Sequence, residues 1–245
     1  MRKWWWRNWL RLVLFAALAA AILFGGLDGI VQYRRQILHL LPQHIGLIVF
    51  SSVPAILLGL ALGVLLSRPS LRRIAEPIIQ VLNIGATIPT LAILALAMMW
   101  LGIGRAPALF ALFLHALLPI VRNTYQGILG VPPHLLETAR GMGMRAAQQL
   151  LWVEFPNALL TILTGIRVAL VINVGIAPLA FLVGGGGLGD LIFSGIDLFE
   201  PKMMLAGAIP TAPLAVLVDF AMTRLIAAII PRGVLRPMDL ALRSA

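Results

Sequence analysis

Residues 137–156 read ETARGMGMRAAQQLLWVEFP and form the longest polar-containing interval between strongly apolar parts of the chain. Pro132 and Pro133 precede this interval, as prolines do at a helix start, and Pro156 is expected to end it. Gly143 permits a bend in the middle. In a helical reading, apolar or small residues recur at spacings of three and four and form one narrow stripe: Leu136, Ala139, Gly143, Ala146 and Leu150. This pattern predicts a short amphipathic helical hairpin, which serves either as a docking surface or as a loop resting on lipid headgroups.

The same interval carries particular residues at fixed spacing. Glu137-Thr138-Ala139 is followed by three residues, Gly143, nine residues and then Val153-Glu154-Phe155-Pro156. This spacing resembles the EAA loop of ABC-importer permeases, which reads E-A-A, three residues, G, nine residues and I-x-L-P. Thr138 replaces the first alanine, and Val153 and Phe155 replace the Ile and Leu. The resemblance implies a cytoplasmic loop that docks on a separate ATPase through Glu137, Thr138, Ala139, Gly143 and Pro156.

The composition indicates an integral membrane protein. Of the 245 residues, 60% are hydrophobic and 11% are charged, whereas soluble domains carry about 25% charged residues. The net charge of +10 does not favour nucleic acid as a partner, because the basic residues punctuate apolar runs instead of clustering on one solvated face. The chain has no cysteine, which excludes disulfides and cysteine-ligated metal.

The apolar runs predict an all-α, polytopic membrane protein with about six transmembrane helices. A helix needs about 20 apolar residues to cross a hydrocarbon core of about 30 Å. The expected spans are residues 12–27, 45–67, 77–104, 108–129, 159–183 and 203–230. We expect residues 12–27 to be an uncleaved first helix and not a signal-peptide core, because tryptophans flank it and many spans follow. Residues 28–44 are then expected to form an outer loop.

The basic residues predict the topology. With both termini in the cytoplasm, the inner segments hold twelve basic residues and the outer loops hold four, as the positive-inside rule requires. The chain is then divided into a basic, Trp-rich segment with the first helix and outer loop (1–44), a transmembrane permease domain (45–230) and a basic cytoplasmic tail (231–245). The loop 132–156 lies in the cytoplasm.

Two ionisable residues fall inside expected spans. Arg167 and Asp219 each lie about 16–18 Å along their helices from the cytoplasmic end. Charges at this depth are unfavourable and generally face the bundle interior with a partner. We expect an Arg167–Asp219 pair that joins the fifth span to the sixth, and the alternative is a charge in the translocation path.

Four further polar or helix-disrupting residues lie at span depth: Asn83, Thr87, Pro89 and Asn173. Breaks in the backbone are tolerated in a membrane where they line protein or a water-filled cavity. These residues are therefore candidates for the translocation path, and the alternative is hydrogen bonding between helices.

Other motifs argue against catalysis by this chain. Gly184-x-Gly186-x-x-Gly189 matches a dinucleotide fingerprint in letters, but it lacks the strand–helix–strand context and is expected to be a hinge or re-entrant corner. No G-x-x-x-x-G-K-[ST] motif occurs, so ATP would be hydrolysed by another chain. The histidines lack metal-ligand spacing, and no serine, histidine and acid form a catalytic set. We expect neither an enzyme nor a metal site.

Three more stretches narrow the resemblance: IPTLAILALAMMWLGIG (88–104), ALLPIVRNTYQGILGV (116–131) and FLVGGGGLGDLIFSGI (181–196). They are similar to permease subunits of bacterial osmoprotectant importers, which carry glycine betaine, choline, carnitine and related solutes. The resemblance implies the type I ABC-importer permease fold in a bacterial inner membrane. Its partners would be cytoplasmic ATPases holding ATP and Mg²⁺, an external substrate-binding protein and a second permease, either identical or paralogous.

Two other functions stay open at this point. Methionine-type ABC permeases have similar stretches, so an amino acid is an alternative substrate. A secondary transporter or channel would need no ATPase, but such proteins usually show internal repeats or charged relay groups at the midplane. We find no repeat, and the ATPase-docking loop would then be unexplained.

Overall fold

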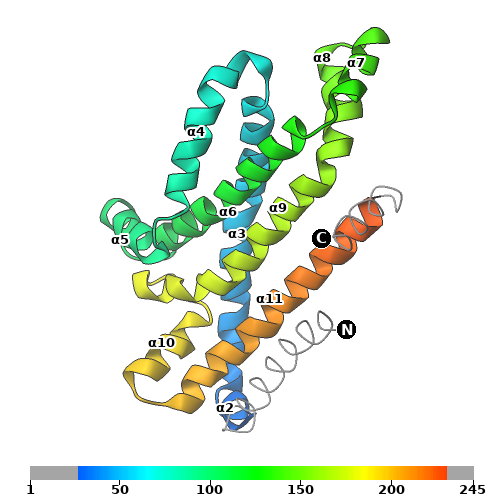
Figure 1. Ribbon diagram of the computed structural model, residues 1–245. Helices are drawn as coiled ribbons and strands as arrows, with labels where there is room; N and C mark the ends of the chain where they lie inside the picture. Colours follow the sequence, from blue (N-terminus) through cyan, green and yellow to red (C-terminus); the bar gives the residue numbers. More distant parts are fainter. Residues whose placement is uncertain (1–26, 231–245) are drawn as a thin grey trace, which may run out of the picture.

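The computed structural model describes residues 27–230, and within this range the chain is helical and has no strand (Figure 1). Four of these helical segments are long and apolar enough to cross a membrane: α3 (Arg34–Leu66), α6 (Arg105–Leu129), Ala146–Val183 and α11 (Pro201–Ile229). A bent pair of helices gives a fifth candidate. The predicted all-α fold is confirmed, whereas the expected first span, 12–27, lies almost wholly outside the described residues, as does the tail 231–245.

The segment 28–44 is helical, and our prediction of an outer loop there was wrong. It comprises α2 (Leu27–Gln32) and the first turns of α3, which continues through Pro42. Pro42 removes one helical hydrogen bond, but burial of Ile37 and Leu40 against Leu188 and Leu191 holds these turns in place. The 33 residues of α3 give a length of about 50 Å, which exceeds the thickness of a bilayer core.

The expected span 77–104 is broken. Its two halves, α4 (Arg72–Gly85) and α5 (Thr90–Leu101), meet at an angle of 98°. Pro89 directly precedes α5 in an extended conformation, and a proline disfavours the helical conformation of the residue before it. The Thr87 hydroxyl donates to the Ile84 carbonyl at 2.7 Å, which closes the last turn of α4. The polar first half and the apolar second half are therefore separate helices.

The centre of the molecule is formed by α3, α6 and α9 (Phe155–Ile176), which approach one another closely at glycines. A Cβ atom on Gly63 of α3 would lie 2.4 Å from Cβ of Thr124 in α6, and one on Gly165 of α9 would lie 2.5 Å from Cβ of Asn123. Small residues are typical of such contacts in membranes, where close packing takes the place of a hydrophobic driving force.

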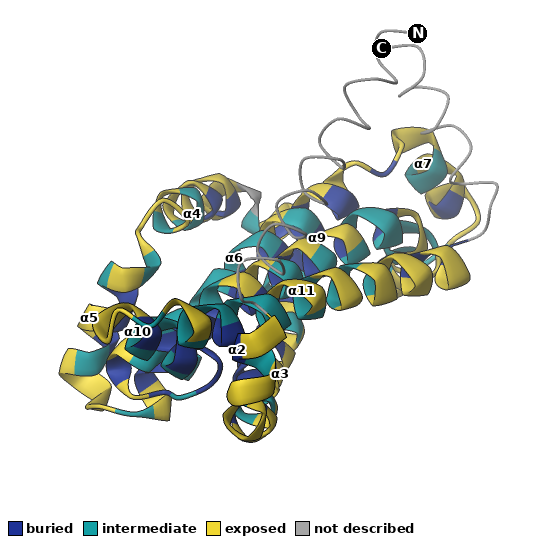
Figure 2. Ribbon diagram, turned by 90° about the horizontal axis from the view of Figure 1, so that it is seen from below, coloured by how far each residue is buried: buried dark blue, intermediate teal, exposed yellow. Residues whose placement is uncertain are grey.

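The outer surface of α11 is much less enclosed (Figure 2). Its buried residues are Ala206, Gly207 and Ile226, and large apolar side chains such as Val216 and Phe220 are exposed. Because lipid is as apolar as these side chains, exposure of this kind is expected on a membrane-facing helix.

The glycine run after the fifth expected span forms a packed corner between η4 (Ala177–Val183) and α10 (Gly189–Asp197). Gly184, Gly186 and Gly187 have φ values of 78°, 77° and 93°, a region that side chains other than glycine rarely adopt. A Cβ on Gly185 would lie 2.8 Å from Cβ of Ala108. The run turns the chain, as predicted, and it has none of the strand context that a dinucleotide fingerprint needs.

Candidate coupling segment and transmembrane cavity

The interval 133–154 contains two short helices, α7 (Pro133–Gly141) and α8 (Ala146–Gln149), followed by one π-helical turn, η3 (Leu150–Glu154). We call this interval the coupling segment. It lies at the end of the molecule opposite α2 and α10 (Figure 1). Gly143 lies between the two short helices with φ 77°, and its N–H donates to the Arg140 carbonyl at 2.9 Å. The structure thus has the hairpin, and the bend at Gly143, that the sequence predicts.

Hydrogen bonds between residues close together in the chain stabilise the second half of this hairpin. The Arg145 N–H donates to Gln148 Oε1, and Gln149 Nε2 donates to the Met144 carbonyl, each at 2.8 Å. The Met144 N–H in turn donates to the Ala139 carbonyl at 3.1 Å, which connects the turn to α7. The shape of the hairpin therefore depends mainly on its own residues.

The predicted coupling residues fall into two groups. Glu137 and Thr138 are exposed, and the Thr138 hydroxyl donates to the His134 carbonyl of its own helix at 2.8 Å. Ala139 is only 1% exposed, so it packs inside the hairpin. Glu137, Thr138 and the exposed Met142 are thus available to a partner, whereas Ala139 shapes the hairpin.

Pro156 does not end the helix, so that part of our prediction was wrong. The chain passes from α8 through η3 directly into α9. In the wide turn, the Phe155 N–H donates to the Leu150 carbonyl, five residues back, and Asn157 Nδ2 donates to the Val153 carbonyl at 2.7 Å. A π-helical turn re-routes the hydrogen bonds near a residue that has no N–H to donate, so Pro156 is accommodated where the coupling segment joins α9.

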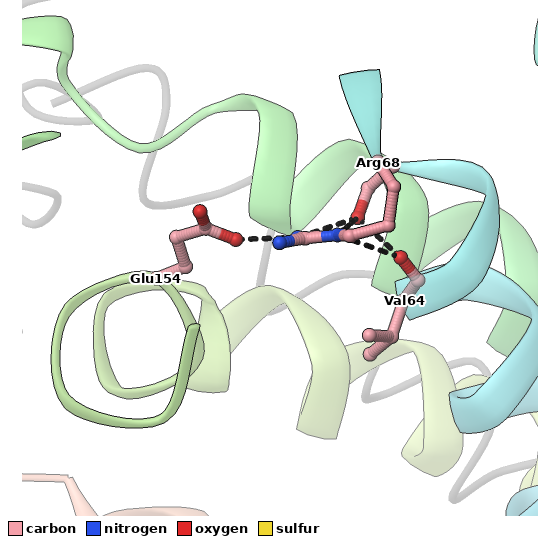
Figure 3. Close-up of polar contacts among 4 residues, drawn as sticks. Val64, Arg68 and Glu154 are labelled. Atoms are coloured by element: carbon pink, nitrogen blue, oxygen red, sulfur yellow. Dashed lines mark hydrogen bonds and ion pairs between the residues drawn. The ribbon is translucent and has the colours of Figure 1, made fainter. Parts of the chain in front are cut away.

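An ion pair that was not predicted from the sequence joins Arg68, just after α3, to Glu154, the last residue of η3 (Figure 3). The available signal was that two loops expected on the same side of the membrane carry opposite charges. Charge alone could not show which of several basic residues would meet Glu154.

A cavity of about 460 Å³ lies between α4, α6 and α9. Its polar lining side chains are Asn83, His115, Arg122, Asn123 and Gln126. Of the candidate path residues, Asn83 lies on the cavity wall, while Thr87 and Pro89 lie at the break that follows it in the chain. Among residues 27–230, no phenylalanine, tyrosine or tryptophan lines this cavity.

Asn173 lies apart from this cavity. It is fully buried, and its Nδ2 donates to Ser52 Oγ at 3.0 Å and to Ser51 Oγ at 3.3 Å. Ser51 also donates to the Leu47 carbonyl at 2.7 Å. Of the two alternatives weighed from sequence, this arrangement corresponds to hydrogen bonding between helices, here α9 and α3.

Arg167 and Asp219 form the expected pair between α9 and α11. Arg167 Nε donates to Asp219 Oδ1 at 2.6 Å and Arg167 Nη2 donates to Asp219 Oδ2 at 2.7 Å, so the contact is bidentate. The two side chains are 35% and 42% exposed. Arg224, a further ionisable residue of α11, was not singled out from the sequence. Its guanidinium carbon lies over the Phe220 ring, 4.7 Å from the ring centre. Within residues 27–230, no three His, Cys, Asp or Glu side chains gather closely enough to hold a metal ion.

The apolar spans, the broken helix pair and the exposed helical hairpin at one end define a multi-pass helical membrane protein. Residues 55–231 match the family described as binding-protein-dependent transport system inner membrane component. The chain belongs to this family, which confirms the resemblance drawn from residues 137–156.

Relatives match over most of the chain. The osmoprotectant import permease protein OsmY of Salmonella typhimurium (strain LT2) is 47% identical over 208 residues, 84% of this chain and 88% of its own. The carnitine transport permease protein OpuCB of Listeria monocytogenes is 41% identical, with 85% and 96% covered. The choline transport system permease protein OpuBB of Bacillus subtilis (strain 168) is 40% identical, with 86% and 98% covered.

Solved structures agree on the fold. An inward-facing structure of the MetNI methionine ABC transporter has a chain that matches with a TM-score of 0.70 and 24% identity, over 80% of this chain and 96% of its own. The predicted type I ABC-importer permease fold is thereby confirmed.

Proposed function

We propose that this chain is the permease subunit of an ATP-driven importer that moves a quaternary ammonium osmoprotectant, such as glycine betaine, choline or carnitine, across a bacterial inner membrane. The observation that carries the substrate class is the agreement among the relatives from three genera, whose names give osmoprotectants, carnitine and choline. Methionine is the weaker alternative, because the methionine transporter matches at only 24% identity.

In this proposal ATP is hydrolysed by a separate subunit that docks on the coupling segment from the cytoplasm. The exposed Glu137 lies at the middle of α7, where a cation of the ATPase can meet it. Met142 is 64% exposed and supplies an apolar contact beside it. Both termini then lie in the cytoplasm, and the corner at α10 faces the substrate-binding protein.

The cavity between α4, α6 and α9 is the proposed path for the solute. Quaternary ammonium groups are held tightly by aromatic cages, and the described residues that line this cavity include no phenylalanine, tyrosine or tryptophan. Tight recognition is therefore assigned to the substrate-binding protein, and this chain offers a weakly interacting route. A second permease, identical or paralogous, completes the path.

The test is reconstitution in proteoliposomes with the cognate ATPase and binding protein. Labelled glycine betaine should enter only with ATP, vanadate should stop it, and unlabelled choline or carnitine should compete while methionine should not. Uptake that continues without ATP would indicate a secondary transporter or channel. Competition by methionine alone would assign the amino-acid alternative, and micromolar binding of glycine betaine to the isolated permease would contradict the weakly interacting route.

A further inference from the structure

Two charged side chains from segments 86 residues apart meet where α3 ends and α9 begins (Figure 3). Arg68 Nη2 donates to Glu154 Oε2. The side chains are 23% and 13% exposed, so water screens them less than it screens a surface pair. This is the more enclosed of the two ion pairs that join long helices in the described part of the chain.

The end of α3 fixes the orientation of the Arg68 guanidinium. Its Nε donates to the Val64 carbonyl at 3.1 Å, and its Nη2 donates to Ser67 Oγ at 2.8 Å. Ser67 Oγ itself donates to the same Val64 carbonyl at 2.7 Å. A cation at a helix C-terminus is favoured by the carbonyls that lack helical partners there. Arg68 is therefore held in place before it meets Glu154.

Glu154 belongs to the coupling segment. It is the last residue of η3, so it follows the hairpin that carries Glu137 and Gly143 and directly precedes α9. A movement of the hairpin must reach Glu154, because the turn between them is continuous helix from Ala146 onward.

Arg68 begins the connection to α4. This connection is short: η2 (Pro69–Leu71) leads directly into α4. Much of α4 is exposed, and its attachment to the bundle includes the buried Ala75 and Ile79, the partly buried Leu82 and a hydrogen bond of 3.0 Å from the Tyr125 hydroxyl to Glu76 Oε1. A lightly attached helix follows a force applied at its first residues more readily than α3 does, because α3 is packed against α6 at Gly63.

We propose that Arg68 and Glu154 are positioning residues that transmit movement of the coupling segment to α4 and thereby to the cavity wall at Asn83. The inference rests on the proposed function, because it assumes that an ATPase moves the hairpin. It adds a second route for that movement: one route is the chain itself from η3 into α9, and the other crosses the ion pair to α4.

The experiment compares Arg68→Gln, Glu154→Gln and the double variant in the reconstituted importer. Solute uptake per ATP hydrolysed is measured at equal amounts of bound ATPase. Each single variant should lower this ratio roughly tenfold, as expected when a charge-assisted hydrogen bond no longer favours the coupled arrangement. The double variant should be no worse than either single variant, because the second substitution has no partner left to remove.

Arg73→Gln is the matched control. Arg73 is an exposed arginine of α4 for which the structure records no ion pair. The Arg73→Gln variant therefore removes the same charge as Arg68→Gln, close to the same place in the chain. The Arg73→Gln variant should show the wild-type solute uptake per ATP hydrolysed. A ratio that falls equally in the control would overturn the proposal, because general loss of positive charge would then explain the effect.

A second measurement separates coupling from folding. The chain has no cysteine, so spin labels can be placed at the exposed positions Gln80 of α4 and Leu57 of α3, the helix that does not follow the coupling segment. The distance between the labels should change on ATP binding in the wild type and stay fixed in the Glu154→Gln variant. Suppose that the wild-type importer transports, and that both Gln variants show the wild-type uptake per ATP hydrolysed and the wild-type change in label distance. This result would overturn the proposal while the proposed function stands. Wild-type importer without ATP-driven uptake would overturn the proposed function itself.

Discussion

The bundle of α3, α6 and α9 and the coupling segment keep their shapes by different means. In the bundle, backbones of segments far apart in the chain touch at glycines, as at Gly63 against Thr124. In the hairpin, the shape comes from local hydrogen bonds such as Arg145 N–H to Gln148 Oε1 and from the positive φ of Gly143, where a Cβ would meet no atom within 4 Å.

This difference separates stability from coupling. A side chain added in the bundle must displace a neighbouring helix, so its effect should appear in the free energy of unfolding. A change on the hairpin displaces nothing, so its effect should appear in transport while the folded protein is kept.

The largest effect is expected for Gly63→Val. The Cβ position already lies 3.0 Å from the Val121 carbonyl oxygen, a backbone atom that cannot move aside alone. The free energy of unfolding should fall by about 3 kcal/mol, the upper part of the range for overpacking, measured by thermal unfolding in detergent. Gly175→Val in α9 is the control, because a Cβ there meets no atom within 4 Å. Equal melting temperatures for the two variants would break the division.

The second effect is expected at the Arg167–Asp219 pair. Asp219→Asn and Arg167→Gln should each destabilise the protein by about 2 kcal/mol, less than a fully buried pair because both side chains are partly exposed. The double variant should lose less than the sum, since each single variant leaves a charge without its partner. Asp197→Asn, at an exposed residue of α10, is the control. If the double variant loses as much free energy of unfolding as the two single variants together, Arg167 and Asp219 do not stabilise the protein as a pair.

The sequence predicted the position of a span correctly where an apolar run alone is enough to define it. Residues 108–129 and 203–230 coincide closely with α6 and α11. Residues 28–44 were predicted wrongly because Pro42 and two arginines suggest a loop, whereas packing of Ile37 and Leu40 on distant residues decides for helix. The break at Pro89 could be suspected from the proline, but its angle depends on how α4 and α5 pack.

The site residues were predictable to the extent that their chemistry is local. The bend at Gly143 follows from one residue type, and the partner of Arg167 follows from the scarcity of charges at that depth. The burial of Ala139 depends on how α7 packs on α8 and η3, and the contact of Arg68 with Glu154 depends on where remote segments meet, neither of which spacing along the chain shows. Likewise, periodicity could not separate Asn83 on the cavity wall from Asn173 between helices.

The third prediction concerns the hairpin. Gly143→Asp adds a charge to the hairpin, and Glu137→Lys reverses one. Both variants should leave the permease inserted and folded but lower ATP-driven uptake roughly tenfold, because an unfavourable charge then meets the ATPase. Uptake and membrane-bound ATPase are both normalised to permease abundance. Gly143→Asn is the control, because asparagine tolerates positive φ and adds no charge, and it should stay within about twofold of the wild type. Normal uptake and normal ATPase retention in both charged variants would show that this hairpin is not the coupling element.

The smallest effect is expected for Asn173→Leu, which removes the hydrogen bonds to Ser51 and Ser52 and keeps the number of non-hydrogen side-chain atoms. Such bonds between helices in a membrane contribute about 0.6–1.7 kcal/mol, so unfolding should become easier by about 1 kcal/mol while the KM for uptake stays the same. Asn83→Leu is the matched comparison. Its side chain lies on the cavity wall, so it should change the KM for uptake and leave the melting temperature unchanged.

The two asparagines therefore test the division with a single substitution type. Asn173 has no exposed surface and lies between α9 and α3, so a solute in the cavity between α4, α6 and α9 has no route to it in this conformation. A changed KM with unchanged stability in Asn173→Leu would instead place Asn173 in the translocation path. The cavity of this conformation would then be only one part of that path, and α3 and α9 would have to separate during transport.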